Sequence, residues 1–93
     1  MTINAKFPMG QLAITPGAIE TLQESGQNPS VFLSRHAVGD WGDLSEGDRQ
    51  ENEYSLTNGF RLLSAYRTTK GDDLWIITEA DRSVTTILLP SEY

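Results

Sequence analysis

The chain has 93 residues, no cysteine, and 13 acidic against 7 basic residues, which give a net charge of −6. This length fits one domain, because a chain of this size buries only about 60–65% of its unfolded surface in a single core. The absence of cysteine excludes disulfides, thiolate nucleophiles and zinc sites that contain cysteine. The negative charge argues against a non-specific binder of nucleic acid.

Neither a membrane span nor a signal peptide is expected. No apolar run reaches the roughly 18 residues that a membrane helix needs. The first ten residues carry Lys6 but have no apolar stretch behind it. The sequence therefore predicts a soluble protein of the cytoplasm.

The chain begins with a segment that has no periodicity. Residues 1–10 contain Pro8 and Gly10, so we expect a flexible amino-terminal arm there. Residues 11–93 then form a single domain. Its first element is a candidate strand over residues 11–14.

Two short helices are predicted next. Thr15 followed by Pro16 is typical of a helix start, and Gly26 is typical of a helix end. Asn28 and Pro29 repeat the start signal at once. The second helix is expected to end near residue 36.

A tryptophan between glycines follows, and then a polar helix. Trp41 lies in the segment Gly39-Asp40-Trp41-Gly42-Asp43, where the glycines let the chain turn and the indole can fold back onto the core. Ser45 with Asp48 resembles a capping box, and residues 58–59 end the helix. Tyr54 and Leu56 are its main apolar residues, so we expect only a narrow side of this helix to face the core.

The carboxyl-terminal third holds most of the β-forming residues. Residues 61–67, 74–79 and 84–89 are short β-branched or aromatic runs separated by turn residues, which predicts three antiparallel strands. Helices that precede such strands favour an α+β fold. We therefore expect short helices packed on one face of a three- to four-stranded antiparallel sheet.

The most charged stretch of the chain is acidic and has two interpretations. It is either a solvated helix face or a docking surface for a basic protein partner. Trp41 within it is either a core residue or a platform for a ligand. The candidate binding residues are Asp40, Trp41, Asp43, Glu46, Asp48, Glu51 and Glu53.

Two further features have alternative readings as well. His36, the only histidine, is either a general acid or base or the cap of a helix end. Arg82, with nearby hydroxyls at a hairpin tip, either binds a phosphate or carboxylate or belongs to an ordinary turn. One histidine with scattered carboxylates lacks the ligand spacing of a metal site, so neither a metal nor a cofactor is expected.

Two segments of the sequence resemble segments of a known protein family. GDWG at residues 39–42 and DRSVTTILLP at residues 81–90 resemble a family of small bacterial proteins found on phages, plasmids and other mobile elements. The resemblance covers roughly residues 11–93 and implies a mobile-element setting without an activity. A more distant similarity, in layout and residue types alone, is to ribonuclease toxins of the RelE and barnase/EndoU type. Those enzymes need a basic substrate face, and this chain is acidic.

Two functional hypotheses follow. The first is a non-enzymatic interaction protein of a mobile element, which modulates a host or defence complex through the acidic surface and could also form a homodimer through an exposed sheet edge. The alternative is a metal-independent ribonuclease that binds RNA. Its catalytic residues would be His36, Tyr66, Arg67, Arg82 and Thr85.

Overall fold

Four strands and three α-helices build the part of the chain that this computed structural model describes, residues 5–93. The predicted α+β class is confirmed. The elements in chain order are β1 (Gln11–Ile14), α1 (Pro16–Ser25), α2 (Pro29–Ala37), α3 (Glu46–Asn58), β2 (Leu62–Arg67), β3 (Asp73–Thr78), β4 (Val84–Leu88) and a short 3₁₀ turn, η1 (Pro90–Glu92).

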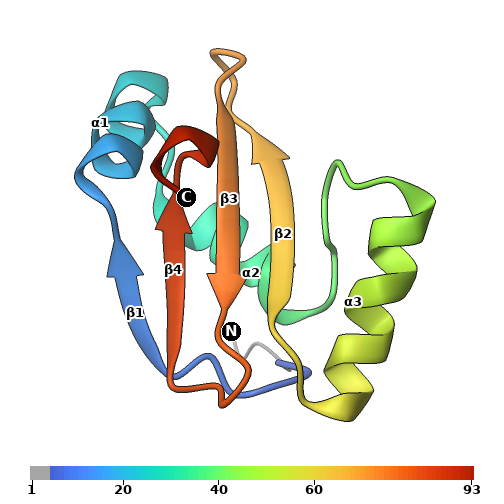
Figure 1. Ribbon diagram of the computed structural model, residues 1–93. Coiled ribbons are helices and arrows are strands. Elements are labelled where there is room, and N and C mark those ends of the chain that lie inside the picture. Colours follow the sequence, from blue (N-terminus) through green and yellow to red (C-terminus); the bar gives the residue numbers. More distant parts are fainter. Residues whose placement is uncertain (1–4) are drawn as a thin grey trace.

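The sheet has the strand order β1-β4-β3-β2 (Figure 1). The pairs β2–β3 and β3–β4 are antiparallel, as predicted, whereas β1 runs parallel to β4. The sheet is therefore mixed, and the expectation of a purely antiparallel sheet was wrong for β1. Hairpin turns fix the direction of β2, β3 and β4, but the whole intervening chain separates β1 from β4 and no turn sets its direction.

The helix boundaries follow the predicted capping residues. The side chains of Thr15, Asn28 and Ser45 accept hydrogen bonds from the first-turn N–H groups of Ala18, Ser30 and Asp48, respectively. Gly26 and Gly59 end α1 and α3 in the left-handed conformation. These local signals, which satisfy the free backbone groups at helix ends, position all three helices along the chain.

The main core lies between the sheet and the first two helices. In Figure 1, α2 lies behind the sheet and α1 beside its β1 side, whereas α3 stands at the opposite edge, next to β2. The carboxyl-terminal turn covers part of the other face, where the ring of Tyr93 meets that of Trp75 edge-on at 5.6 Å. The buried residues of the main core are Ala18, Leu22, Phe32, Tyr66, Leu74, Ile76 and Ile87.

The segment before β1 belongs to a second, smaller core. Phe7 is only 6% exposed and clusters with Trp41 and Leu62. The N–H of Lys6 donates to the carbonyl of Ala37 at 2.8 Å. Lys6 and Phe7 therefore contact the domain within the segment where a flexible arm is expected; residues 1–4 of that segment lie outside the described residues.

The β2 edge of the sheet is covered. Ala65 donates its N–H to the carbonyl of Trp41 at 3.1 Å and accepts from the N–H of Asp43 at 2.7 Å, so residues 41–43 lie along β2. Gly42 has a φ of 78°, and a Cβ there would stand 2.0 Å from the carbonyl oxygen of Ala65. Only glycine fits this close approach.

The helix α3 reaches the same edge through polar side chains. Its buried residues are Asn52 and Ser55, whereas Tyr54 is 57% exposed and Leu56 is partly buried beside the second core. As expected, only a narrow side of α3 faces the core, and its buried residues are polar. The unpaired backbone groups of an edge strand need hydrogen-bonding partners, and the Asn52 amide supplies them where an apolar side chain could not.

Candidate functional site

The exposed side of α3 and the turn before it carry four of the carboxylates that form no salt bridge within residues 5–93. Asp43, Glu46, Asp48 and Glu51 are all exposed. Within residues 5–93, none of these carboxylates forms a salt bridge. We call these four residues, together with Tyr54 and Phe60, the α3 surface.

Tyr54 and Phe60 form a stacked aromatic pair on the α3 surface. Their ring centroids are 5.9 Å apart and their planes are inclined by 9°. The two side chains are 57% and 52% exposed. Glu51 lies three residues before Tyr54 and hence beside it on the helix. Sequence reasoning missed this pair, because neither Tyr54 nor Phe60 was given a binding role.

A hollow of about 210 Å³ lies between α3 and β2. It has both acidic and apolar walls, and Arg61 provides the one basic group among its lining residues. The residues that line it are Leu44, Asp48, Glu51, Asn52, Ser55, Arg61 and Leu63. A partner side chain that enters here meets the carboxylates of Asp48 and Glu51 beside the apolar surface of Leu63.

Two of the predicted acidic binding residues, Asp40 and Glu53, bond to other side chains of the protein. Asp40 accepts from Nε of Arg35 at 2.7 Å, and this bond lowers the pKa of Asp40 and raises that of Arg35. Glu53 accepts a hydrogen bond from the indole N–H of Trp41 at 2.7 Å. Trp41 is only 2% exposed, so it is a core residue whose ring is not available to a partner.

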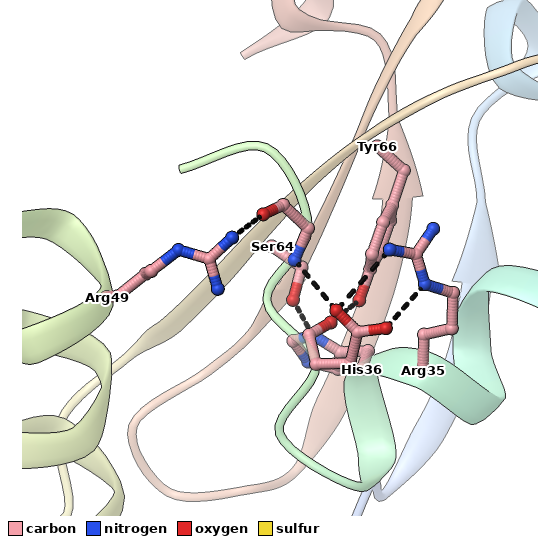
Figure 2. Close-up of polar contacts among 7 residues, drawn as sticks. Arg35, His36, Arg49, Ser64 and Tyr66 are labelled. Atoms are coloured by element: carbon pink, nitrogen blue, oxygen red, sulfur yellow. Dashed lines mark hydrogen bonds and ion pairs between the residues drawn. The ribbon is translucent and has the colours of Figure 1, made fainter. Parts of the chain in front are cut away.

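Figure 2 shows how the loop after α2 is fixed. Arg49 donates to the carbonyl of Gly42, and the hydroxyl of Tyr66 donates to the carbonyl of Asp40. Burial raises the pKa of Tyr66 to about 12, so its hydroxyl stays protonated and keeps donating at neutral pH. The guanidinium carbon of Arg35 lies 4.6 Å from the centre of the Tyr66 ring. The GDWG segment thus has a structural role.

His36 is completely buried and belongs to a chain of hydrogen bonds whose direction can be worked out. Thr85 donates its hydroxyl to the carbonyl of Met9 at 2.6 Å, so it must accept from Thr78 at 2.7 Å. Thr78 has then used its proton and accepts from Nε2 of His36 at 2.9 Å. Nε2 of His36 therefore carries a proton. Because burial lowers the pKa of His36 to about 4, the ring is neutral at neutral pH, and Nδ1 accepts from the hydroxyl of Ser64 at 2.5 Å.

The surroundings of His36 keep it neutral. Burial, and secondarily the positive charge of Arg82, lower its pKa to about 4. Phe7 and Trp41 contact the imidazole edge-on, with ring centroids 5.3 and 5.7 Å away. With both ring nitrogens bonded inside the protein and no exposed surface, His36 has no position from which to exchange a proton with a substrate in this structure.

Arg82 connects the β3–β4 hairpin to the end of α3. It has a positive φ of 61°, which is strained for a residue with a side chain. Its guanidinium donates to the backbone carbonyls of Ser55, Phe60 and Glu79 at 3.2, 2.7 and 3.2 Å. These bonds to the carboxyl end of α3 hold the residue in its unfavourable conformation.

The five residues of the ribonuclease hypothesis do not come together at an accessible site. His36, Tyr66 and Thr85 are buried with their polar atoms bonded inside the protein. Arg67 is exposed at the far end of β2, paired with Asp73 at 3.3 Å. No group of three or more metal-ligating side chains occurs within residues 5–93.

Comparison with known proteins gives no neighbour for this arrangement. No family model, curated protein or solved structure matches the chain. Among the described residues, no helix is long and apolar enough to cross a membrane. The surface chemistry of residues 5–93 is therefore the basis for assigning a function.

Proposed function

We propose that this chain is a non-enzymatic interaction protein that captures a basic protein partner through the α3 surface. The observation that carries the proposal is the exposed Tyr54–Phe60 stack beside carboxylates that form no salt bridge within residues 5–93. Tyr54 and Phe60 are each more than half exposed, so both rings are accessible to a partner. Their position beside these carboxylates favours a cationic partner.

The carboxylates and the aromatic pair of the α3 surface contribute to binding in different ways. Exposed charges speed and steer the encounter, but an exposed ion pair contributes only about 0–1 kcal/mol. Aromatic and arginine side chains dominate binding energy at interfaces. An arginine of the partner can lie against the Tyr54–Phe60 pair and reach the carboxylate of Glu51 at the same time.

The setting proposed for this interaction is a mobile genetic element in a cytoplasm, where the protein would modulate a host or defence complex. Support for that setting is limited to the resemblance of the GDWG and DRSVTTILLP segments. The ribonuclease alternative lacks support in the site, because its proposed proton carrier, His36, is fully buried and bonded at both nitrogens.

A pull-down with two charge variants tests the proposal. Asp48→Lys/Glu51→Lys reverses two charges on the α3 surface, and Glu20→Lys/Glu24→Lys makes the same charge change on α1. Tagged wild-type and variant proteins are incubated with lysate, and the captured proteins are quantified by mass spectrometry. The proposal expects loss of a basic partner from the first variant only; equal capture by all three proteins would contradict it.

A further inference from the structure

Ser55 on α3 differs from the other buried polar residues of the described chain. Ser55 is only 4% exposed, and its hydroxyl takes part in no hydrogen bond within residues 5–93. A buried hydroxyl without a partner is costly, and in native proteins it is uncommon. The other buried polar residues all form hydrogen bonds through their side chains; they are His36, Asn52, Ser64, Thr68, Thr78 and Thr85.

The Ser55 hydroxyl opens into the hollow between α3 and β2. Every completely buried side-chain nitrogen or oxygen within residues 5–93 has a hydrogen-bond partner. Because the Ser55 hydroxyl has none, its oxygen must keep a small accessible surface, and Ser55 lines this hollow. The wall of the hollow therefore contains a recessed polar group that the described chain does not satisfy.

Two carboxylates lie on the same face of α3 as Ser55. Asp48, Glu51 and Ser55 follow one another at intervals of three and four residues, which places them on one side of the helix, and all three line the hollow. Leu44 and Leu63 add apolar walls. Hydrogen-bond acceptors beside an apolar wall match a long cationic side chain, which has an apolar stem and donors at its end.

The basic residue that lines the hollow does not neutralise these carboxylates. Within residues 5–93, Arg61 forms no salt bridge with Asp48 or Glu51. Its guanidinium carbon instead lies 5.3 Å from the centre of the Tyr93 ring at the carboxyl terminus. The carboxylates of Asp48 and Glu51 are therefore available to a cation from outside.

We propose that this hollow binds an arginine side chain of the basic partner, an inference that rests on the proposed function for the identity of that partner. Its volume lies below the roughly 300 Å³ at which pockets for drug-sized ligands begin, and it suits a single side chain. The acceptors extend along α3 from Asp48 to Ser55, a distance of about 10 Å at the rise of a helix. A guanidinium presents five donors in a planar fork and bridges acceptors on successive turns, whereas the ammonium of lysine is compact. The hollow therefore prefers arginine to lysine.

Titration with a small probe tests the hollow in the absence of the partner. N-acetyl-arginine amide is added to isotope-labelled protein, and the backbone amide signals are followed by NMR. The probe should give saturable shifts centred on residues 51–55 and 63, with a dissociation constant on the order of 1 mM. N-acetyl-lysine amide should bind several-fold more weakly, and the citrulline analogue, which has the shape of arginine without its charge, should not saturate. Equal binding of the three probes, or no saturation by the arginine probe, would overturn the proposal.

Matched variants test whether the acceptors of the hollow hold the arginine probe. Asp48→Asn/Glu51→Gln keeps the shape of the hollow and removes its charge, so binding should weaken at least about tenfold. Ser55→Ala removes only the hydroxyl and should weaken binding about threefold. Glu20→Gln/Glu24→Gln makes the same charge change on α1 and should bind within about twofold of wild type. Equal binding by all four proteins would place the probe elsewhere and overturn the proposal.

The same experiments separate the hollow from the proposed function. If the arginine probe does not bind and Asp48→Lys/Glu51→Lys still loses the partner, the arginine pocket is overturned and the α3 surface keeps its role. If the probe binds in the hollow while every variant captures the partner equally, the pocket is supported and the proposed function is contradicted.

Discussion

The side-chain amide of Asn52 on α3 bonds to both backbone groups of Leu63 on β2. Its nitrogen donates to the Leu63 carbonyl at 2.6 Å, and its oxygen accepts from the Leu63 N–H at 3.1 Å. A neighbouring strand would make the same two bonds. This contact attaches the helix that carries the proposed binding surface to the edge of the sheet.

Replacing Asn52 should therefore destabilise the fold. Asn52→Ala leaves a partly buried N–H and C=O of Leu63 without partners, which should lower the free energy of unfolding by about 2–3 kcal/mol. Urea unfolding measures the change. Gln50→Ala on the exposed side of the same helix is the matched control and should stay within about 0.5 kcal/mol of wild type. Equal stability of the two variants would show that the Asn52 contact does not attach the helix.

Replacing Gly42 and Gly47 by alanine should change the stability of the fold in opposite directions. Gly42→Ala introduces a Cβ that meets the carbonyl of Ala65 and the ring of Tyr66, at a positive φ, so it should destabilise by more than about 2 kcal/mol. Gly47 lies in α3 with nothing within 4 Å of a Cβ, so Gly47→Ala should stabilise by about 0.5–1 kcal/mol. Thermal unfolding of both variants gives the comparison.

The segment before β1 should contribute to stability. Phe7 is 6% exposed and packs against Trp41 with ring centroids 6.3 Å apart. Phe7→Ala should lower the free energy of unfolding by about 3–4 kcal/mol, the usual cost of removing a buried aromatic ring. Pro8→Ala, at an exposed neighbouring position, is the control. A small effect of Phe7→Ala would restore the interpretation of residues 5–10 as an arm.

The buried imidazole makes stability depend on pH in a defined window. Above pH 6.5 His36 is neutral in both the folded and unfolded states. Between pH 6.5 and about 4 the unfolded state binds a proton that the folded state does not, so stability falls as the pH falls, by about 3 kcal/mol in total. The chain has a single histidine, so its ring proton signal is readily assigned by NMR.

The titration of that signal checks the expectation. In the folded protein it should not shift until the pH approaches 4, whereas in urea-unfolded protein it should titrate near 6.5. His36→Gln removes the titrating group, and its stability should decrease less steeply between pH 6.5 and 4. A folded-state titration near 6.5 would mean that the imidazole is accessible, and it would reopen a proton-transfer role.

The sequence correctly predicted the ends of the helices, because local signals determine them. Thr15, Asn28 and Ser45 begin the helices, and Gly26 and Gly59 end two of them, because capping depends on a few neighbouring residues. The parallel direction of β1 and the packing of residues 5–10 depend on contacts distant in sequence, and no local pattern indicated them.

The candidate site was predicted in composition but not in detail. The acidic stretch is present on α3, yet the structure assigns Asp40 and Glu53 to internal hydrogen bonds and exposes Tyr54. One signal for the buried His36 was available. Hydroxyl residues at inward positions of three apolar strands, Ser64, Thr78 and Thr85, indicate that a polar group is buried among them.

The salt dependence of partner binding tests the central claim most directly. Affinity of the captured partner is measured by calorimetry at several salt concentrations for wild type, Asp48→Lys/Glu51→Lys and Glu20→Lys/Glu24→Lys. We predict that affinity falls steeply with salt for wild type and for the α1 variant, and that the α3 variant binds weakly with a shallow salt dependence. Identical affinities and slopes for all three proteins would contradict a role of the α3 surface in partner binding.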